Sequence, residues 1–209
     1  MSTPDRSIDP RLIESARKSF LKNGFIGASL SEICADAGVT TGALYKRYKG
    51  KDELFQACVQ ELLDQMEARV GVYDGKDLSG CSDQKLLSLW CNTEENNLEW
   101  MRFLNSSRDS FILLVRCANG SRYENFRHDF CEKMAIVDYP YLVELQKRGL
   151  ARPDISREEL HMLLTGFWEL ICEPFVHDFD GPQIEKHMRV CARLINWKAA
   201  LELKTGAET

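Results

Sequence analysis

The sequence predicts an all-α protein, on three observations from its 209 residues. Apolar residues recur at three- and four-residue intervals through most long segments, as they do along one face of a helix. Capping residues stand before these segments, and glycines stand after them. No segment sustains the apolar and polar alternation of a half-buried strand. The predicted fold is an N-terminal three-helix helix-turn-helix head followed by a larger C-terminal helical domain.

The first predicted helix begins at Asp9-Pro10, where an N-cap residue precedes a proline at the first helical position. Asn23-Gly24 ends this helix, because glycine readily adopts the left-handed conformation that follows a last helical turn. Its inner face is predicted to consist of Leu12, Ile13, Ala16 and Phe20.

Two short helices and one long helix follow. Ser29 begins an S-L-S-E capping box, which starts a helix that ends at Gly38. Thr40 caps the next helix, which ends near Gly50, and the tight glycine turn between the two short helices predicts a helix-turn-helix. A longer helix begins at Lys51. Its inner side is formed by Leu54, Phe55, Cys58, Val59, Leu62, Leu63 and Met66.

Further helices fill the rest of the chain. One begins near Asp83, after the polar segment GVYDGKDLSGCSD. Capping boxes at Ser121 (S-R-Y-E) and Ser156 (S-R-E-E) start two others. The helix from Ser121 is predicted to run to Gly149, with a kink at Pro140.

The last two predicted helices carry more apolar surface than one contact needs, because each has a second apolar stripe beside the first. Such helices are either interior to a bundle or shared between subunits. We interpret them as the interface of a homodimer closed by a four-helix bundle. The alternative is a monomer in which other helices cover both stripes. The predicted interface consists of Leu160, Leu164, Phe167, Ile171, Ile184, Met188, Cys191 and Ile195.

Charge is distributed unevenly along the chain. Residues 1–60 carry nine basic and seven acidic side chains, a net of +2, whereas the other 149 residues carry 18 basic and 25 acidic side chains, a net of -7. This asymmetry is expected if only the head meets a polyanion. We therefore divide the chain into a helix-turn-helix DNA-binding domain, residues 1–52, and a helical ligand-binding and dimerisation domain, residues 53–209.

The residues of the head favour double-stranded DNA as the polyanion. In a helix-turn-helix, the N-terminal part of the second helix enters the major groove while the preceding helix crosses the backbone. That N-terminal part is small and can approach base edges closely. Basic and aromatic side chains lie a turn further on, within reach of phosphates. The predicted DNA-binding residues are Ser29, Thr40, Thr41, Gly42, Ala43, Tyr45, Lys46, Arg47 and Lys51.

The stretch LSEICADAGVTTGALYKRYKGKDEL, residues 30–54, resembles the DNA-binding signature of the TetR family of bacterial transcriptional regulators. The resemblance covers about residues 10–57. The departures are small: Cys34 stands where alanine is usual, Tyr48 where phenylalanine is usual, and Arg47 where histidine or tyrosine is common. No motif of the remaining helices extends the resemblance.

The resemblance implies a homodimeric repressor of a palindromic operator, with a pocket among the middle helices for an unknown small-molecule effector. An effector must bind two dimer geometries with different affinities, because equal affinity would shift nothing. The mixture of aromatic and acidic residues suits a flat, apolar or cationic ligand. Candidate pocket residues are Trp90, Trp100, Phe103, Phe111, Arg116, Tyr123, Phe126 and Trp168.

Two other functions compete with this interpretation. An enzyme is disfavoured, because the chain has no phosphate-binding glycine loop, no GxSxG and no HExxH, and no cofactor is expected. A redox- or metal-responsive DNA-binding regulator is the alternative. His128 with Cys131, and His187 with Cys191, have spacings that place two ligands on one helical face.

The expected location is the cytoplasm, with no membrane partner. No apolar run is long enough to span a bilayer, and MSTPDRSIDP is unlike a signal peptide. The eight cysteines are scattered and form no CxxC pair, as reduced and buried thiols are.

Overall fold

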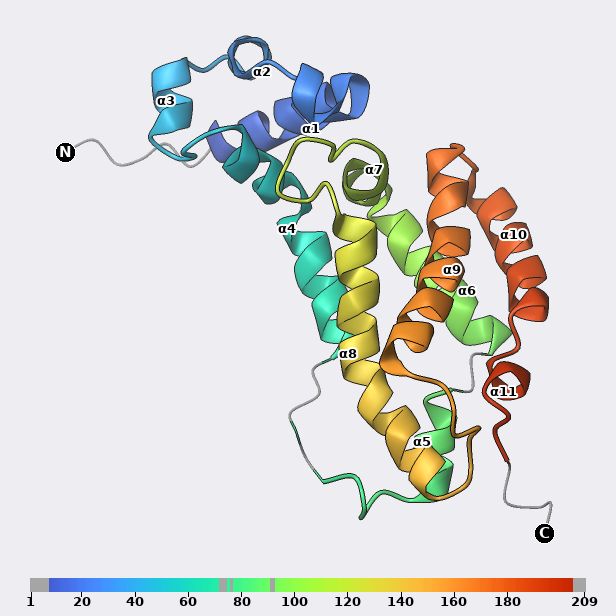
Figure 1. Ribbon diagram of the computed structural model, residues 1–209. Coiled ribbons are helices and arrows are strands. Elements are labelled where there is room, and N and C mark those ends of the chain that lie inside the picture. The colour runs from blue at the N-terminus through green and yellow to red at the C-terminus, as the bar shows by residue number, and fades with distance from the viewer. Residues whose placement is uncertain (1–7, 72–74, 76, 91–92, 205–209) are drawn as a thin grey trace. The chain divides into compact units, whose positions relative to one another are not determined.

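The computed structural model describes residues 8–71, 75, 77–90 and 93–204. Over these residues the secondary structure is helical, without a strand, as Figure 1 shows. Their contacts form two compact units. Unit 1 takes the chain up to residue 69 together with residues 107–126, and unit 2 takes residues 70–106 together with the chain from residue 127 onward.

Unit 1 contains the three helices of the head and two further helices. Gly24, at φ 68° and ψ 173°, interrupts the first helix at the predicted position. The glycine at 38, with φ 65°, makes the turn between the two short helices. The helices of this unit are α1 (Ile8–Gly27), α2 (Leu30–Asp36), α3 (Thr41–Tyr45), α4 (Lys51–Val70) and α7 (Arg108–Arg116).

Three phenylalanines hold the centre of unit 1. The ring of Phe55 on α4 meets the rings of Phe20 and Phe25 edge-on, with centroids 5.0 and 5.5 Å away. Such edge-to-face pairs add to the free energy gained from burial. The amide of Phe25 also donates to the carbonyl of Cys117, at 2.8 Å, so the chain after α7 is joined to the end of α1.

The cap predictions divide into those confirmed and those that were wrong. Thr40 accepts a hydrogen bond from the amide of Ala43, and Ser156 forms a complete capping box with Glu159. Ser29 precedes α2 but makes no side-chain cap, because its hydroxyl pairs with that of Ser31 at 2.8 Å.

The helix predicted from Ser121 begins instead at residue 126. The Ser121 hydroxyl donates to the carbonyl of Ala118 and accepts from the amide of Tyr123. The Glu124 carboxylate accepts from the amide of Gly120 rather than from that of Ser121. These bonds close a turn, so residues 121–125 do not start the helix.

Unit 2 is a set of helices packed around one apolar cluster that includes Leu86, Leu142, Leu145 and Leu160. The helix α10 contacts both α6 and α9, and Figure 1 shows α9 and α10 side by side. Its helices are α5 (Asp83–Ser88), α6 (Glu94–Ser106), α8 (Phe126–Lys147), α9 (Arg157–Val176), α10 (Gly181–Leu194) and α11 (Trp197–Ala200). Of these, α8 continues through Pro140.

Ion pairs join α6 to α10 along the surface of unit 2. The guanidinium of Arg102 donates to the carboxylate of Glu185 at 3.0 Å, and Arg189 pairs with Glu94. Because these side chains are exposed to solvent, water and salt screen the pairs and they contribute little to stability. No helix among the described residues is both long and apolar enough to cross a membrane.

Candidate functional site

Helix α3 presents its first turn to solvent. Thr40, Thr41 and Gly42 are exposed, and the Thr40 cap to the Ala43 amide, at 3.1 Å, fixes where the helix begins. Leu44 is fully buried and anchors the helix to the head from the opposite side. One anchored residue and one cap therefore hold a five-residue helix with its small side chains outward.

The second turn of α3 adds an aromatic ring and a positive charge to the same surface. The side chain of Tyr45 is 58% exposed, so it does not pack in the core. Lys46 is also exposed, and it forms no ion pair with the rest of the described chain. A hydroxyl and an ammonium group at this position suit contacts with phosphate oxygens. Ser29, which precedes α2, is half-buried.

Arg47 is engaged within the head. Its Nε lies 2.7 Å from Oδ1 of Asp9, and its guanidinium donates to the carbonyl of Ala43 at 3.3 Å. With 19% of its side chain exposed, Arg47 braces α3 against the start of α1. These contacts give Arg47 a structural role in the head, and its phosphate contact stays a prediction.

Lys51 is likewise engaged within unit 1. Its ammonium donates to the carbonyls of Ile26 and Ala28, at 3.1 and 3.0 Å, and lies 4.8 Å from the centroid of the Phe25 ring. The carbonyls at the end of a helix lack partners within the helix, and a lysine is well suited to supply them. Lys51 therefore ties the start of α4 to the end of α1, and its phosphate contact stays a prediction.

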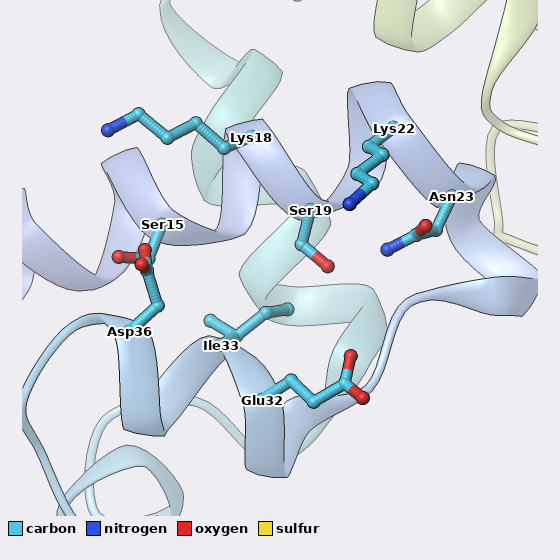
Figure 2. A pocket seen from close by; sticks show the side chains of 8 residues that line it. All are labelled: Ser15, Lys18, Ser19, Lys22, Asn23, Glu32, Ile33 and Asp36. Carbon is cyan, nitrogen blue, oxygen red and sulfur yellow. The ribbon is translucent and has the colours of Figure 1, made fainter.

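A shallow hollow of about 210 Å³ separates α1 from α2 in unit 1. Figure 2 shows Lys18 and Lys22 on one wall and Glu32 and Asp36 on the other. Because both signs of charge face the hollow, it does not concentrate positive potential. We assign it no anion.

The predicted pocket residues are divided between the two units. Phe111, Arg116, Tyr123 and Phe126 lie in unit 1. Phe111 is fully buried, and the Tyr123 ring lies 6.1 Å from that of Phe55. Trp90, Trp100, Phe103 and Trp168 lie in unit 2.

Two of the predicted residues, Trp90 and Trp100, line a hollow of about 260 Å³ in unit 2. Asp138, Phe167 and Trp197 line it as well. Neither Asp138 nor Trp197 was among the pocket residues predicted from the sequence. Neither residue carries a local motif, and Asp138 lies about fifty positions from Trp90 and about sixty from Trp197.

Six of the eight predicted interface residues are buried inside unit 2: Leu160, Leu164, Ile171, Ile184, Met188 and Cys191. Phe167 and Ile195 are half-buried. These side chains form the core of unit 2 and its edge, so they pack within the chain, and the predicted interface stays a prediction. The exposed apolar side chains on the same two helices are Met162, Leu163, Val190 and Leu194.

The described cysteines are free thiols. No group of three potential ligands lies together among the described residues, and Cys91 is outside them. The Sγ of Cys191 does lie 3.2 Å from Nε2 of His187, as the spacing predicted. Burial raises the pKa of the thiols of Cys34, Cys117 and Cys191. It raises the pKa of the Cys58 thiol to about 12 and that of the Cys131 thiol to about 11.

A helix whose exposed first turn is small, and which is held by a glycine turn against a second short helix, is the arrangement that reads the major groove of DNA. Residues 40–45 and the turn before them therefore have the architecture of a helix-turn-helix DNA-binding module. The sequence profile of bacterial regulatory proteins of the tetR family matches residues 12–58, so this segment is a DNA-binding domain of the tetR type.

Two bacterial transcriptional regulators are similar to this chain in sequence. The HTH-type transcriptional regulator UidR of Escherichia coli is 35% identical over 169 residues, which are 80% of this chain. The chain spans 65% of the length of UidR. The HTH-type transcriptional regulator TtgR of Pseudomonas putida is 34% identical over 83 residues, 38% of this chain and 40% of TtgR.

Solved structures share the fold at low sequence identity. NalD, the secondary repressor of the MexAB-OprM multidrug efflux pump in Pseudomonas aeruginosa, has a TM-score of 0.62 at 21% identity, covering 90% of this chain and 96% of NalD. MexZ, a key repressor responsible for antibiotic resistance in the same organism, has a TM-score of 0.56 at 18% identity, covering 96% of this chain and all of MexZ.

Proposed function

We propose that the protein is a dimeric transcriptional repressor that binds a palindromic operator and is released from it by a small molecule. The observation that carries the proposal is the exposed first turn of α3. Thr40, Thr41 and Gly42 are small and open to solvent, while Leu44 and the Thr40 cap fix the helix beneath them. A preorganised helix of this kind loses little conformational freedom on binding DNA.

The contacts divide into those that specify and those that position. Thr41 and Ala43 lie where a thymine methyl or a base edge can be reached. Tyr45 and Lys46 are suited to phosphates, which set register without reading sequence. Arg47 and Lys51 support the reading helix from within the head.

The exposed apolar residues of α9 and α10 support dimerisation. Val190 is 61% exposed and Leu194 is 71% exposed, one turn apart on α10. Met162 and Leu163 are exposed on the adjacent α9. Apolar side chains grouped on two neighbouring helices favour a self-complementary interface, which two-fold symmetry requires. A two-fold dimer in turn favours a palindromic operator.

Repression and release are proposed with support from the family and from unit 2. NalD and MexZ, which share the fold, are described as repressors. Unit 2 contains a hollow that can hold a small ligand. Ligand binding releases DNA only if the ligand prefers a dimer geometry that does not fit two successive major grooves. We expect no catalytic activity.

Selection of bound sequences from random duplex DNA tests the DNA-binding part. The parent protein should enrich a palindrome. Lys46→Ala should weaken binding about equally for all sequences and reduce the salt dependence by about one phosphate contact per subunit. Thr41→Ala should instead change the enriched sequence.

Lys186→Ala is the matched control, because it removes the same charge from an exposed position on α10. It should leave affinity within about twofold of the parent. Equal losses for Lys46→Ala and Lys186→Ala would mean that DNA is attracted by overall charge rather than by α3. Enrichment of no sequence at low salt would refute the proposed operator.

A further inference from the structure

The hollow of about 260 Å³ in unit 2 is assembled from five elements that are separated in sequence. Trp90 follows α5, Trp100 belongs to α6, Asp138 to α8, Phe167 to α9 and Trp197 to α11. Its volume lies slightly below the ~300 Å³ at which ligand pockets commonly begin. A ligand that fits here is therefore small.

Four of the ten residues that line the hollow are aromatic. The centroid of Trp197 lies 6.3 Å from that of Trp90 and 5.9 Å from that of Phe167. The planes of Trp197 and Phe167 are inclined by 83°, so one ring meets the other edge-on. Rings inclined to one another can present faces to a ligand from more than one side, and an aromatic face attracts a cation.

The single charged residue among those lining this hollow in the described chain is Asp138. Its side chain forms no ion pair or hydrogen bond with the described residues. Burial alone raises its pKa to about 6, so the carboxyl is still mainly ionised at pH 7. A partly desolvated carboxylate without a cationic neighbour is costly, and a bound cation would offset that cost.

Two further observations restrict the chemical class of ligand that the hollow can bind. The indole N–H of Trp90 is buried without an acceptor among the described residues, so a second polar group of the wall is also unsatisfied. A neighbouring hollow shares Trp90 and Trp197 but is lined by Arg193 and Lys198. Trp90 and Trp197 therefore stand between a hollow with a negatively charged lining and a hollow with a positively charged lining. The hollow that contains Asp138 would repel an anion, and the one that contains Arg193 and Lys198 would attract it.

We propose that the hollow lined by Trp90, Trp100, Asp138, Phe167 and Trp197 binds a small organic cation, with its charged nitrogen at Asp138 and its apolar part among the rings. A metal ion suits this lining poorly, because Asp138 is its only carboxylate and the other side-chain oxygen donors, Ser88 and Asn96, are neutral. The idea that this cation is the effector rests on the proposed function. The binding of the cation in the hollow does not depend on the proposed function.

The test uses a matched pair of probes, phenethylammonium and 2-phenylethanol, which differ mainly in charge. The full chain has four tryptophans, and Trp168 is the one outside the lining of this hollow. In a Trp168→Phe background, tryptophan fluorescence therefore reports from Trp90, Trp100 and Trp197. Phenethylammonium should change the fluorescence saturably and bind about tenfold more tightly than 2-phenylethanol.

Asp138→Asn should abolish the preference for the cation while leaving binding of 2-phenylethanol within about twofold. Asp129→Asn removes the same charge from an exposed position on the same helix and should leave the preference intact. Equal binding of the two probes, absence of saturation, or an equal loss in the two variants would overturn the proposal.

The effector role is tested separately, by measuring whether the cation releases the protein from duplex DNA that carries the enriched palindrome. Release of that DNA by phenethylammonium from the parent, but not from Asp138→Asn, would support it. Cation binding without release would leave the site intact and refute the effector role. Failure to enrich any palindrome would refute the proposed function without bearing on the fluorescence result.

Discussion

At the scale of single residues, the role of a charged side chain depends on what it touches. Lys46 and Lys51 stand five positions apart in one basic cluster, yet Lys46 is exposed and Lys51 donates to two backbone carbonyls. Residue type and spacing do not distinguish the two lysines. What distinguishes them is the position of two backbone carbonyls, those of Ile26 in α1 and of Ala28 just after it, which accept hydrogen bonds from Lys51.

Asp138 should make stability depend on pH. Its pKa is about 6 in the fold against an ordinary value of 3.8, so the folded state binds more protons between these values and stability falls as pH rises through that window. Asp138→Asn should raise the free energy of unfolding at pH 7.5 by about 2–3 kcal/mol, and the gain should vanish below pH 4.

Urea unfolding at pH 3.5, 5 and 7.5 measures this gain. Asp129→Asn should stay within about 0.5 kcal/mol of the parent at each pH, because Asp129 is exposed. An Asp138→Asn protein that is less stable than the parent at pH 7.5 would show that the carboxylate has a stabilising partner.

The thiols should resist modification in the order of their burial. Cys81 is half-buried, whereas the other described cysteines are buried. With a pKa of about 11, Cys131 has roughly 100-fold less thiolate than a thiol at 9.0. Under native conditions at pH 7.5, mass spectrometry should show N-ethylmaleimide on Cys81 before the other described cysteines. Rapid modification of Cys131 or Cys191 would favour the redox alternative instead.

At the scale of elements, the short helices of the head depend on anchors outside themselves. Helix α3 has five residues, too few to be stable alone. Leu44, the Thr40 cap and the Arg47 to Asp9 pair hold it in place. The start of α4 is held by Lys51. The geometry of the reading helix is therefore a property of the whole head.

Lys51→Ala should destabilise the head by about 1–2 kcal/mol, because two carbonyls lose a charged donor and the Phe25 ring loses its cation. Thermal unfolding measures the effect. Lys49→Ala is the control, since 92% of that side chain is exposed, and it should shift stability by about 0.5 kcal/mol or less. If Lys51→Ala is as stable as the parent but binds DNA weakly, Lys51 contacts phosphate after all.

At the scale of the whole molecule, α9 and α10 each carry two apolar surfaces. One side of α9 and α10 fills the core of unit 2, through residues such as Leu160 and Met188. The other side remains exposed at Met162, Leu163, Val190 and Leu194. Both sides have helical periodicity, so the sequence predicted two stripes but not which of them is internal.

Leu194→Glu should convert the proposed dimer to a monomer and strongly weaken binding to the proposed operator, because a charge would be buried in the proposed interface. Sedimentation velocity measures the oligomeric state. Ile136→Glu is the control, as Ile136 on α8 is 55% exposed and lies outside the proposed surface. A Leu194→Glu protein that sediments as the parent does would move the interface elsewhere.

The sequence by itself determined the helical class, the helix-turn-helix and the family resemblance, because these depend on caps, glycines and periodicities within a few residues of one another. The Thr40 and Ser156 caps and the burial of Leu44 follow from such local patterns. The Ser121 box failed where competing bonds within a turn were available.

Only the tertiary structure decided which charges are engaged, which apolar stripe is internal and which aromatic residues meet. Asp138 comes near Trp90 and Trp197 because α5, α8 and α11 converge around one hollow, although these residues are far apart in the chain. Desolvation and ion pairing depend on distances through space. No pattern along the sequence encodes them locally.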